Sequence, residues 1–230
     1  MTELSRRYFW YLFIVVLACL GAICSASAQE EGRGGYLEQR PIWFAEIKTS
    51  DPPLHGVQSV YHGSGCWLSE RLILTCWHNI RDNWKKPGHT VCVVDFRGQE
   101  YCNLEIVALD KKADLLLLRV KGNISGHGWC VVSSDPETDS QFDLRCYGLD
   151  TDGKRFRWTL GKVIEGRSWM AGRKRAGLWT DALVVQGMSG GPAVGYDGMI
   201  HGVNLGHANG QSQMVSLSYL QAFLDAANVE

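Results

Sequence analysis

The sequence predicts an all-β protein, and three observations support this expectation. Short apolar runs rich in valine, tryptophan and tyrosine alternate with turn residues along most of the 230-residue chain. This spacing is typical of the strands of a sandwich or barrel, whereas long helical periodicity is hard to find. The stretch over 122–128 contains several glycines and is typical of a connector, so we expect two β halves on either side of it.

The expected elements follow one another at short intervals along the chain. In chain order, the predicted strands cover 57–61, 72–75, 90–96, 115–120, 130–133, 144–148, 158–164, 178–185, 193–194, 199–205 and 214–217. One helix is predicted over 218–227, because Leu220, Phe223 and Leu224 fall on a single helical face. Ser218 is the residue type that commonly caps a helix N-terminus.

The first 28 residues have the pattern of a signal peptide. Two arginines precede an apolar run over 8–23, and Ala26-Ser27-Ala28 matches a small-residue cleavage site. The apolar run is shorter than the roughly 20 residues of a membrane-spanning helix. We therefore expect cleavage after Ala28, a secreted or periplasmic protein, and no stable membrane insertion afterwards. A retained anchor and lipidation of Cys19 stay open as alternatives.

Six cysteines lie beyond this leader, at positions 66, 76, 92, 102, 130 and 146. An even number outside the cytosol favours disulfide bonds. Sequence neighbours are expected to pair, because Cys92 and Cys102 flank a predicted turn at 97–98, and buried free thiols are the alternative. No C-x-x-C pair or H-E-x-x-H segment occurs, so neither a metal site nor a cofactor is expected.

Composition and charge exclude one class of partner. The formal net charge is -1 and 45% of residues are hydrophobic. This apolar fraction is typical of a packed globular chain. Because nucleic-acid binding relies on an excess of positive charge, we expect no nucleic-acid partner.

Three segments carry the chemistry. A strand ending in Thr75-Cys76-Trp77-His78 delivers a histidine where the chain leaves the sheet. Asp114 opens the apolar run Leu115-Leu116-Leu117-Leu118, and Asp110 is a weaker candidate because no apolar strand follows it directly. The segment Gly187-Met188-Ser189-Gly190-Gly191-Pro192 places a serine among glycines that permit a sharp turn.

These residue types suit acyl transfer. A serine hydroxyl is a weak nucleophile that needs an adjacent base, and histidine can take up and return its proton near neutral pH. A carboxylate such as Asp114 would fix the imidazole tautomer and stabilise the imidazolium. The backbone N–H groups of Gly187 and Ser189 are candidate donors to the oxyanion. The predicted catalytic residues are therefore His78, Asp114 and Ser189.

In these segments the chain resembles the chymotrypsin-like serine peptidase family, over about residues 56–224. It is most similar to the bacterial branch that includes the heat-shock proteases and the glutamyl endopeptidases. The resemblance implies two perpendicular β-barrels, over about 40–122 and 129–217, with the active site in the cleft between them. It also implies a trypsin-like protease domain over 29–230 and a protein or peptide substrate cleaved through an acyl-enzyme on Ser189.

The sequence departs from the family pattern around the serine. Met188 occupies the position where pancreatic-type members carry an aspartate that pairs with a newly cut N-terminus.

The resemblance places Leu183 at the base of the specificity pocket, and Asn204 and Leu205 on the strand that contacts the substrate. An uncharged pocket predicts a preference for apolar residues on the acyl side of the cleaved bond. A shift of the loop that brought Asp181 into the pocket would instead favour lysine or arginine.

Two other functions compete with an active endopeptidase. A binding module built on an inactivated protease fold is the first alternative, although such modules normally lose a triad residue and none is lost here. Another acyl-transfer hydrolase is the second. An α/β-hydrolase carries its residues in the order serine, acid, histidine, whereas this chain has the order histidine, aspartate, serine.

Overall fold

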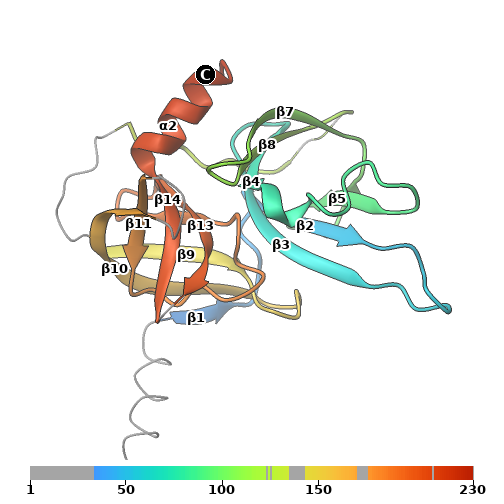
Figure 1. The fold of residues 1–230 in the computed structure, drawn as a ribbon, viewed down its shortest axis with the longest axis horizontal. Coiled ribbons are helices and arrows are strands. Elements are labelled where there is room, and N and C mark those ends of the chain that lie inside the picture. Colours follow the sequence, from blue (N-terminus) through green and yellow to red (C-terminus); the bar gives the residue numbers. More distant parts are fainter. Residues whose placement is uncertain are drawn as a thin grey trace, which may run out of the picture. The chain divides into compact units, whose positions relative to one another are not determined.

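The computed structural model describes residues 34–122, 124, 126–134, 143–169, 176–208 and 210–229. The predicted leader, with Cys19, lies outside the described residues, and so do two positions of the connector over 122–128. Two β-sheets and a C-terminal α-helix make up most of the described chain (Figure 1). The all-β fold class predicted from the sequence is confirmed.

The first sheet is curled but open. Its strands run in the order β6-β5-β2-β3-β4-β8-β7, and among the described residues no ladder joins β6 to β7. The strands are β2 (Phe44–Ser50), β3 (Val60–Trp67), β4 (Leu72–Cys76), β5 (Thr90–Val94), β6 (Glu100–Tyr101), β7 (Leu104–Asp110) and β8 (Leu115–Val120). All of the pairings in this sheet are antiparallel.

The second sheet closes into a barrel of six strands. Its order is β10-β11-β14-β13-β12-β9, and β9 pairs with β10 to complete the ring, while β1 lies at the edge beside β10. The strands are β1 (Gly34–Leu37), β9 (Asp143–Leu149), β10 (Phe156–Trp169), β11 (Ala176–Thr180), β12 (Pro192–Val194), β13 (Ile200–Ala208) and β14 (Gln211–Ser216). Register shifts along β10 and β13 bend these two strands, which closure of a barrel requires.

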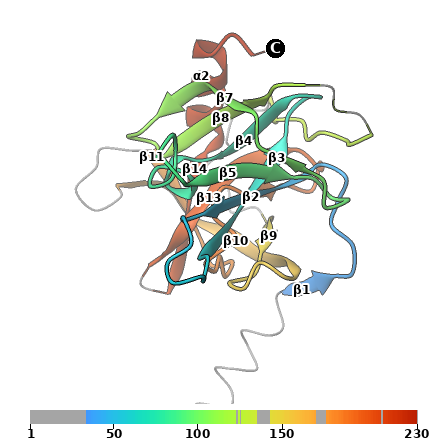
Figure 2. The ribbon, with the colours of Figure 1, turned by 90° about the vertical axis from the view of Figure 1, so that its right-hand side faces the viewer.

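Helix α2 (Leu217–Ala226) follows β14 directly, at the position predicted from its apolar face (Figures 1 and 2). Leu220, Phe223 and Leu224 are buried, as the helical spacing required. The predicted N-cap was wrong by two residues, because Ser216 occupies that position and makes no side-chain cap hydrogen bond. Among the residues described, no helix is long and apolar enough to cross a membrane.

Strand β2 (Phe44–Ser50) was not predicted from the sequence. Its charged residues break the apolar pattern, yet Glu46 is buried and binds Arg40 and His62 through its two carboxylate oxygens. Conversely, the predicted strand over 130–133 is reduced to one parallel bridge between Val132 and Ile200. In both regions the pairing partners are distant in sequence, so local patterning did not reveal them.

One hydrophobic cluster joins the two sheets and the helix. It contains Leu74 and Leu117 from β4 and β8, Val203 from β13, and Leu220 from α2, all of them buried. A separate hydrophobic cluster packs inside each of the two curled sheets. Since β4, β8 and β13 share this cluster, their ends are held in a fixed relation across the two halves.

One of the predicted disulfides is present. Cys92 in β5 is bonded to Cys102, which follows β6. The other neighbour pairs were wrong, because Cys66, Cys76, Cys130 and Cys146 are buried free thiols. Cys66 faces Leu74 across the β3–β4 ladder and is therefore out of register with Cys76. The Cys66 thiol hydrogen-bonds Cys130 instead, which together with burial raises the pKa of Cys66.

Candidate active site

His78 lies where β4 leaves the first sheet. A short 3-10 turn, Trp77–Asn79, begins at the end of the strand and turns the imidazole toward a cavity. The ring Nδ1 lies 2.6 Å from Oδ2 of Asp114, and the backbone N–H of His78 donates to Oδ1 at 2.9 Å. Both hydrogen bonds orient the ring and leave Nε2 outside this pair. The side chains of His78 and Asp114 are 30% and 21% exposed, so the pair is only partly screened by water.

Asp114 occupies an unusual backbone conformation. Its φ angle of 59° lies in the left-handed region, which few residues other than glycine adopt at low cost. The strand pairing explains how this conformation is maintained, because the Asp114 carbonyl accepts the N–H of Trp77 at 3.0 Å beside the β4–β8 ladder. The constraint aims the carboxylate at His78.

Asp110, the weaker sequence candidate, has a different place. Its Oδ1 accepts the N–H groups of Lys112 and Ala113, and its Oδ2 accepts the hydroxyl of Tyr219 at 2.6 Å. Asp110 thus organises the β7–β8 turn that presents Asp114. Of the two aspartates, Asp114 is the one that contacts the histidine.

Ser189 lies in the loop before β12, and glycine is required beside it. Gly190 has a φ of 85°, and a Cβ atom there would lie 2.3 Å from the Ser64 carbonyl oxygen and 2.4 Å from Thr75 Oγ1. Gly187 also lies in the left-handed region, with a φ of 96°. The glycines predicted to permit a sharp turn therefore also allow the serine loop to approach the first sheet closely.

Two residues that the sequence reasoning did not select hold this loop from the opposite sheet. The backbone N–H of Ser64 and the Asn79 side-chain Nδ2 both donate to the Ser189 carbonyl at 2.9 Å. Ser64 lies within the segment Gly63-Ser64-Gly65, and a small residue between two glycines is the signal for close backbone approach that could have identified it. Asn79 directly follows His78 and carried no signal of its own.

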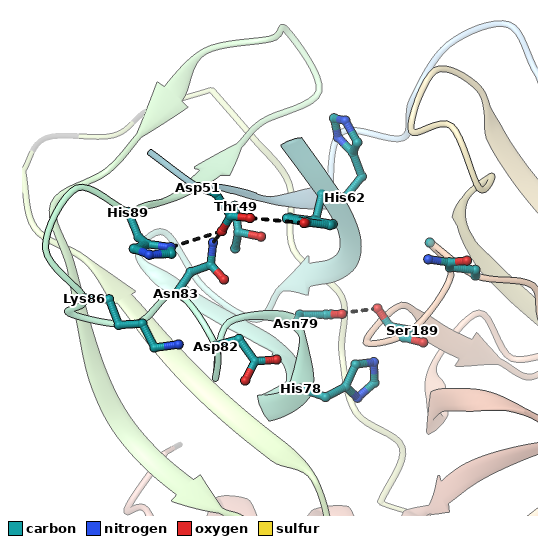
Figure 3. Close-up of a pocket in the computed structure, with 13 residues that line it drawn as sticks. Thr49, Asp51, His62, His78, Asn79, Asp82, Asn83, Lys86, His89 and Ser189 are labelled. Carbon is teal, nitrogen blue, oxygen red and sulfur yellow. Dashed lines mark hydrogen bonds and ion pairs between the residues drawn. The ribbon is translucent and has the colours of Figure 1, made fainter. Parts of the chain in front are cut away.

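Ser189 and His78 come from different sheets and line one cavity of about 420 Å³ (Figure 3). In the structure the Ser189 hydroxyl donates to the Leu205 carbonyl at 2.9 Å. Among the described residues, His78 and Ser189 make no hydrogen bond to each other. Transfer of the serine proton to the imidazole would require the hydroxyl to rotate from Leu205 toward Nε2.

The two backbone N–H groups predicted to bind an oxyanion are not engaged elsewhere. Within the described part of the chain, neither the Gly187 N–H nor the Ser189 N–H donates to an acceptor. The intervening Met188 N–H is engaged with the Val185 carbonyl at 3.0 Å, so it is not available. The two uncommitted donors therefore lie on either side of Met188, in the loop that presents the serine hydroxyl.

The rest of the cavity is polar. Oδ1 of Asp51 lies 3.0 Å from Nδ1 of His89, and the Asp51 carboxylate accepts hydrogen bonds from Asn83 and Tyr61. The remaining lining residues are Thr49, His62, Asn79, Asp82, Lys86, Gln186 and Gly187. In Figure 3 the labelled side chains, among them Asp82, Asn83 and Lys86, lie around the space beside His78 and Ser189.

The residues predicted to determine specificity lie outside this cavity lining. Leu183 is half-buried, and Asp181 accepts the N–H of Lys162 through Oδ1 at 2.6 Å. Asn204 is fully buried, and its amide donates to the Tyr147 carbonyl at 3.0 Å. Leu205 contributes its carbonyl to Ser189, as described above.

One group of possible metal ligands occurs here. Cys76 Sγ, a ring nitrogen of His78 and a carboxylate oxygen of Asp114 lie within 4.8 Å of one another. Burial raises the pKa of Cys76 well above its usual range, and the Asp114 carboxylate adds to this, although the N–H of Gly190 opposes it. A metal ion binds the thiolate, so binding there would require Cys76 to lose its proton. The neutral thiol donates to the Asn204 carbonyl instead.

Comparison with known proteins shows the family of the chain. Residues 63–203 match the family model of the trypsin-like peptidase domain, which is more than half of the chain. The match includes the segments that carry His78, Asp114 and Ser189. No curated protein sequence matches the chain.

Proposed function

We propose that this chain, which belongs to the trypsin-like peptidase family, is a serine endopeptidase with Ser189 as its nucleophile. His78 acts as the general base and Asp114 orients it. The observation that carries the proposal is the meeting of His78 and Ser189, from separate sheets, at one cavity in which the imidazole is already bound to Asp114 at 2.6 Å.

In the proposed reaction, Ser189 Oγ attacks the carbonyl carbon of the scissile peptide bond and its proton passes to His78 Nε2. The carbonyl π electrons move onto oxygen, and the N–H groups of Gly187 and Ser189 stabilise that oxyanion. The imidazolium then protonates the departing amine as the C–N bond breaks. Water then attacks the acyl-enzyme, and His78 takes up the proton of the water. The same histidine returns a proton to Ser189 Oγ as the ester bond breaks.

The position of His78 also suggests which part of the substrate fills the cavity. Because His78 protonates the leaving amine, the chain that follows the cleaved bond should emerge on its side. The cavity extends from His78 along Asp82, Asn83 and Lys86. We propose that it accepts the leaving-group portion of the substrate, with polar side chains.

On the acyl side, we propose a preference for apolar residues. It rests on the assignment of Leu183 to the base of the specificity pocket, with Asn204 and Leu205 on the neighbouring strand. Asp181 is hydrogen-bonded to the backbone of β10, which argues against its entering the pocket. Profiling cleavage on a peptide library tests the assignment, and a profile dominated by lysine or arginine would contradict it.

We propose, too, that the chain is exported and begins at Gln29 after cleavage of its leader. The support is the sequence pattern over 1–28 together with the Cys92–Cys102 disulfide, which suits an oxidising compartment. Intact mass spectrometry of protein from its native compartment tests this. An uncleaved leader would contradict the start at Gln29, and a free Cys92 thiol would contradict export.

The decisive experiment compares the wild-type chain with Ser189→Ala. Wild-type protein should hydrolyse peptides and be labelled by a fluorophosphonate, and the variant should lose both, with a fall in kcat of about 10⁶-fold. The wild-type rate should rise with pH, because the histidine must be neutral to act as the base. A folded wild-type chain that neither reacts nor cleaves would point to a binding module instead.

A further inference from the structure

The serine loop is held without a charged residue next to the nucleophile. Met188 precedes Ser189, is fully buried and carries no charge. An oxyanion site requires its N–H donors to be fixed before the reaction, since reorganisation during the reaction would cost rate. Some other group must therefore fix the backbone between Gly187 and Ser189.

Ser64, in the middle of β3, makes three contacts with the second barrel. Its hydroxyl donates to the Gly187 carbonyl at 2.6 Å and accepts the N–H of Leu149 at 2.9 Å. Its backbone N–H donates to the Ser189 carbonyl at 2.9 Å. Ser64 is 0% exposed, so water cannot replace these hydrogen bonds.

The contact with Gly187 bears directly on the two proposed oxyanion donors. Those donors are the N–H groups of Gly187 and Ser189, and a single peptide group, between Gly187 and Met188, lies midway between them. Its carbonyl is bound by Ser64 Oγ, and its N–H is bound by the Val185 carbonyl at 3.0 Å. Anchoring both ends of this peptide group prevents its rotation, which fixes the neighbouring N–H groups on either side.

We propose that the Ser64 hydroxyl is a positioning group that pre-forms the oxyanion site across the boundary between the two sheets. This inference rests on the proposed peptidase function and adds a residue to it. Ser64 does not touch the substrate. It acts through Gly187, so its effect should appear where negative charge develops on the substrate oxygen and not in ground-state binding.

The test is Ser64→Ala, measured with a peptide substrate and with a peptide aldehyde of the same acyl sequence. Ser189 adds to the aldehyde carbon, its proton passes to His78, and the former carbonyl oxygen occupies the oxyanion site. We expect kcat to fall about 10- to 100-fold, less than for direct removal of a donor, while KM changes by less than about twofold. The aldehyde Ki should rise by the same factor as kcat falls.

Two variants serve as controls. Ser50→Ala removes another nearly buried hydroxyl, on neighbouring β2, which binds Thr90 and Gln58 and does not contact the serine loop. It should leave kcat and the aldehyde Ki within about twofold of wild type. Ser64→Cys retains a weak donor and should recover part of the lost rate. It also supplies the measurement if circular dichroism shows that the alanine variant does not fold.

Three results would overturn the inference. The first is a Ser64→Ala enzyme with wild-type kcat, the second is an equal loss in Ser50→Ala, and the third is a loss confined to KM. If Ser64→Ala does not fold, a Ser64→Cys enzyme with wild-type kcat and aldehyde Ki would overturn it as well. Failure of the proposed function is distinguishable, because the wild-type chain would then neither cleave peptide nor bind the aldehyde.

Discussion

The two halves of this molecule hold their parts of the site in different ways. In the first sheet, His78 and Asp114 are bound to each other through a ring nitrogen and a backbone N–H, next to the ends of the neighbouring strands β4 and β8. In the second barrel, the Ser189 carbonyl is held by Ser64 and Asn79, which belong to the opposite sheet. The proposed base is therefore prepared within one half, whereas the proposed nucleophile depends on contact between the halves.

This difference predicts which part of the site each substitution should affect. Changes within the His78–Asp114 pair should affect proton transfer and leave the serine loop in place. Changes at the boundary should misplace the serine loop and leave the pair intact. The Ser189 hydroxyl, which is bonded to Leu205 and not to His78, illustrates that the two parts are prepared separately.

Among the variants that test this comparison between the two halves, Asp114→Asn should have the largest effect. The amide cannot hold the imidazole in the same tautomer or stabilise its positive charge, so kcat should fall about 10⁴-fold with little change in stability. Steady-state kinetics and thermal unfolding measure the two effects. Asp197→Asn, at a carboxylate that binds His201 away from the cavity, is the matched control. Loss of less than about tenfold in Asp114→Asn would contradict the assigned role.

Next in size should be Gly190→Ala, which addresses the boundary. The new Cβ would meet the Ser64 carbonyl at 2.3 Å in a left-handed backbone, and we expect a loss of about 2–4 kcal/mol in the free energy of unfolding. Peptidase activity should fall as well, because the serine loop must move away from the first sheet. Denaturant unfolding and kcat are the measurements.

Gly198→Ala separates contact from backbone strain. Gly198 also has a positive φ, of 77°, but no atom lies within 4 Å of a Cβ built there. It should show only the strain cost of about 1 kcal/mol and no loss of activity. Equal behaviour of the two alanine variants would show that close approach at Gly190 is unimportant.

A smaller effect is expected for Asn79→Ala. The Ser189 carbonyl would keep its hydrogen bond from the Ser64 N–H, so we expect kcat to fall only about three- to tenfold. Combining Asn79→Ala with Ser64→Ala tests whether the two residues act on the same loop. Strictly additive losses in the double variant would indicate that they act independently.

The smallest effect on activity should come from removing the Cys92–Cys102 disulfide. The bond closes a short loop that contains β6, and neither cysteine belongs to the cavity lining. Cys92→Ala/Cys102→Ala should lose about 2–4 kcal/mol of stability while kcat stays unchanged at temperatures where the protein is folded. A fall in kcat without unfolding would mean that the outer strands of the first sheet also position the site.

Much of this site could be anticipated because it is encoded locally. A histidine at a strand end, an aspartate before an apolar strand and a serine among glycines each occupy a short segment of sequence. The strand pattern likewise predicted the all-β class, and the apolar face of 218–227 predicted the helix found at Leu217–Ala226. Where local pattern and tertiary pairing disagreed, as in β2 with its buried Glu46, the prediction failed.

The sequence by itself determined the fold class, the family resemblance and the three residues proposed for catalysis. Only the tertiary structure decided that Ser64 reaches Gly187, that Cys66 lies beside Cys130, and that Asn79 holds the Ser189 carbonyl. The reason is physical. Each of these contacts joins residues far apart in the chain, and their distances depend on how two sheets pack around a shared core, which no short segment specifies.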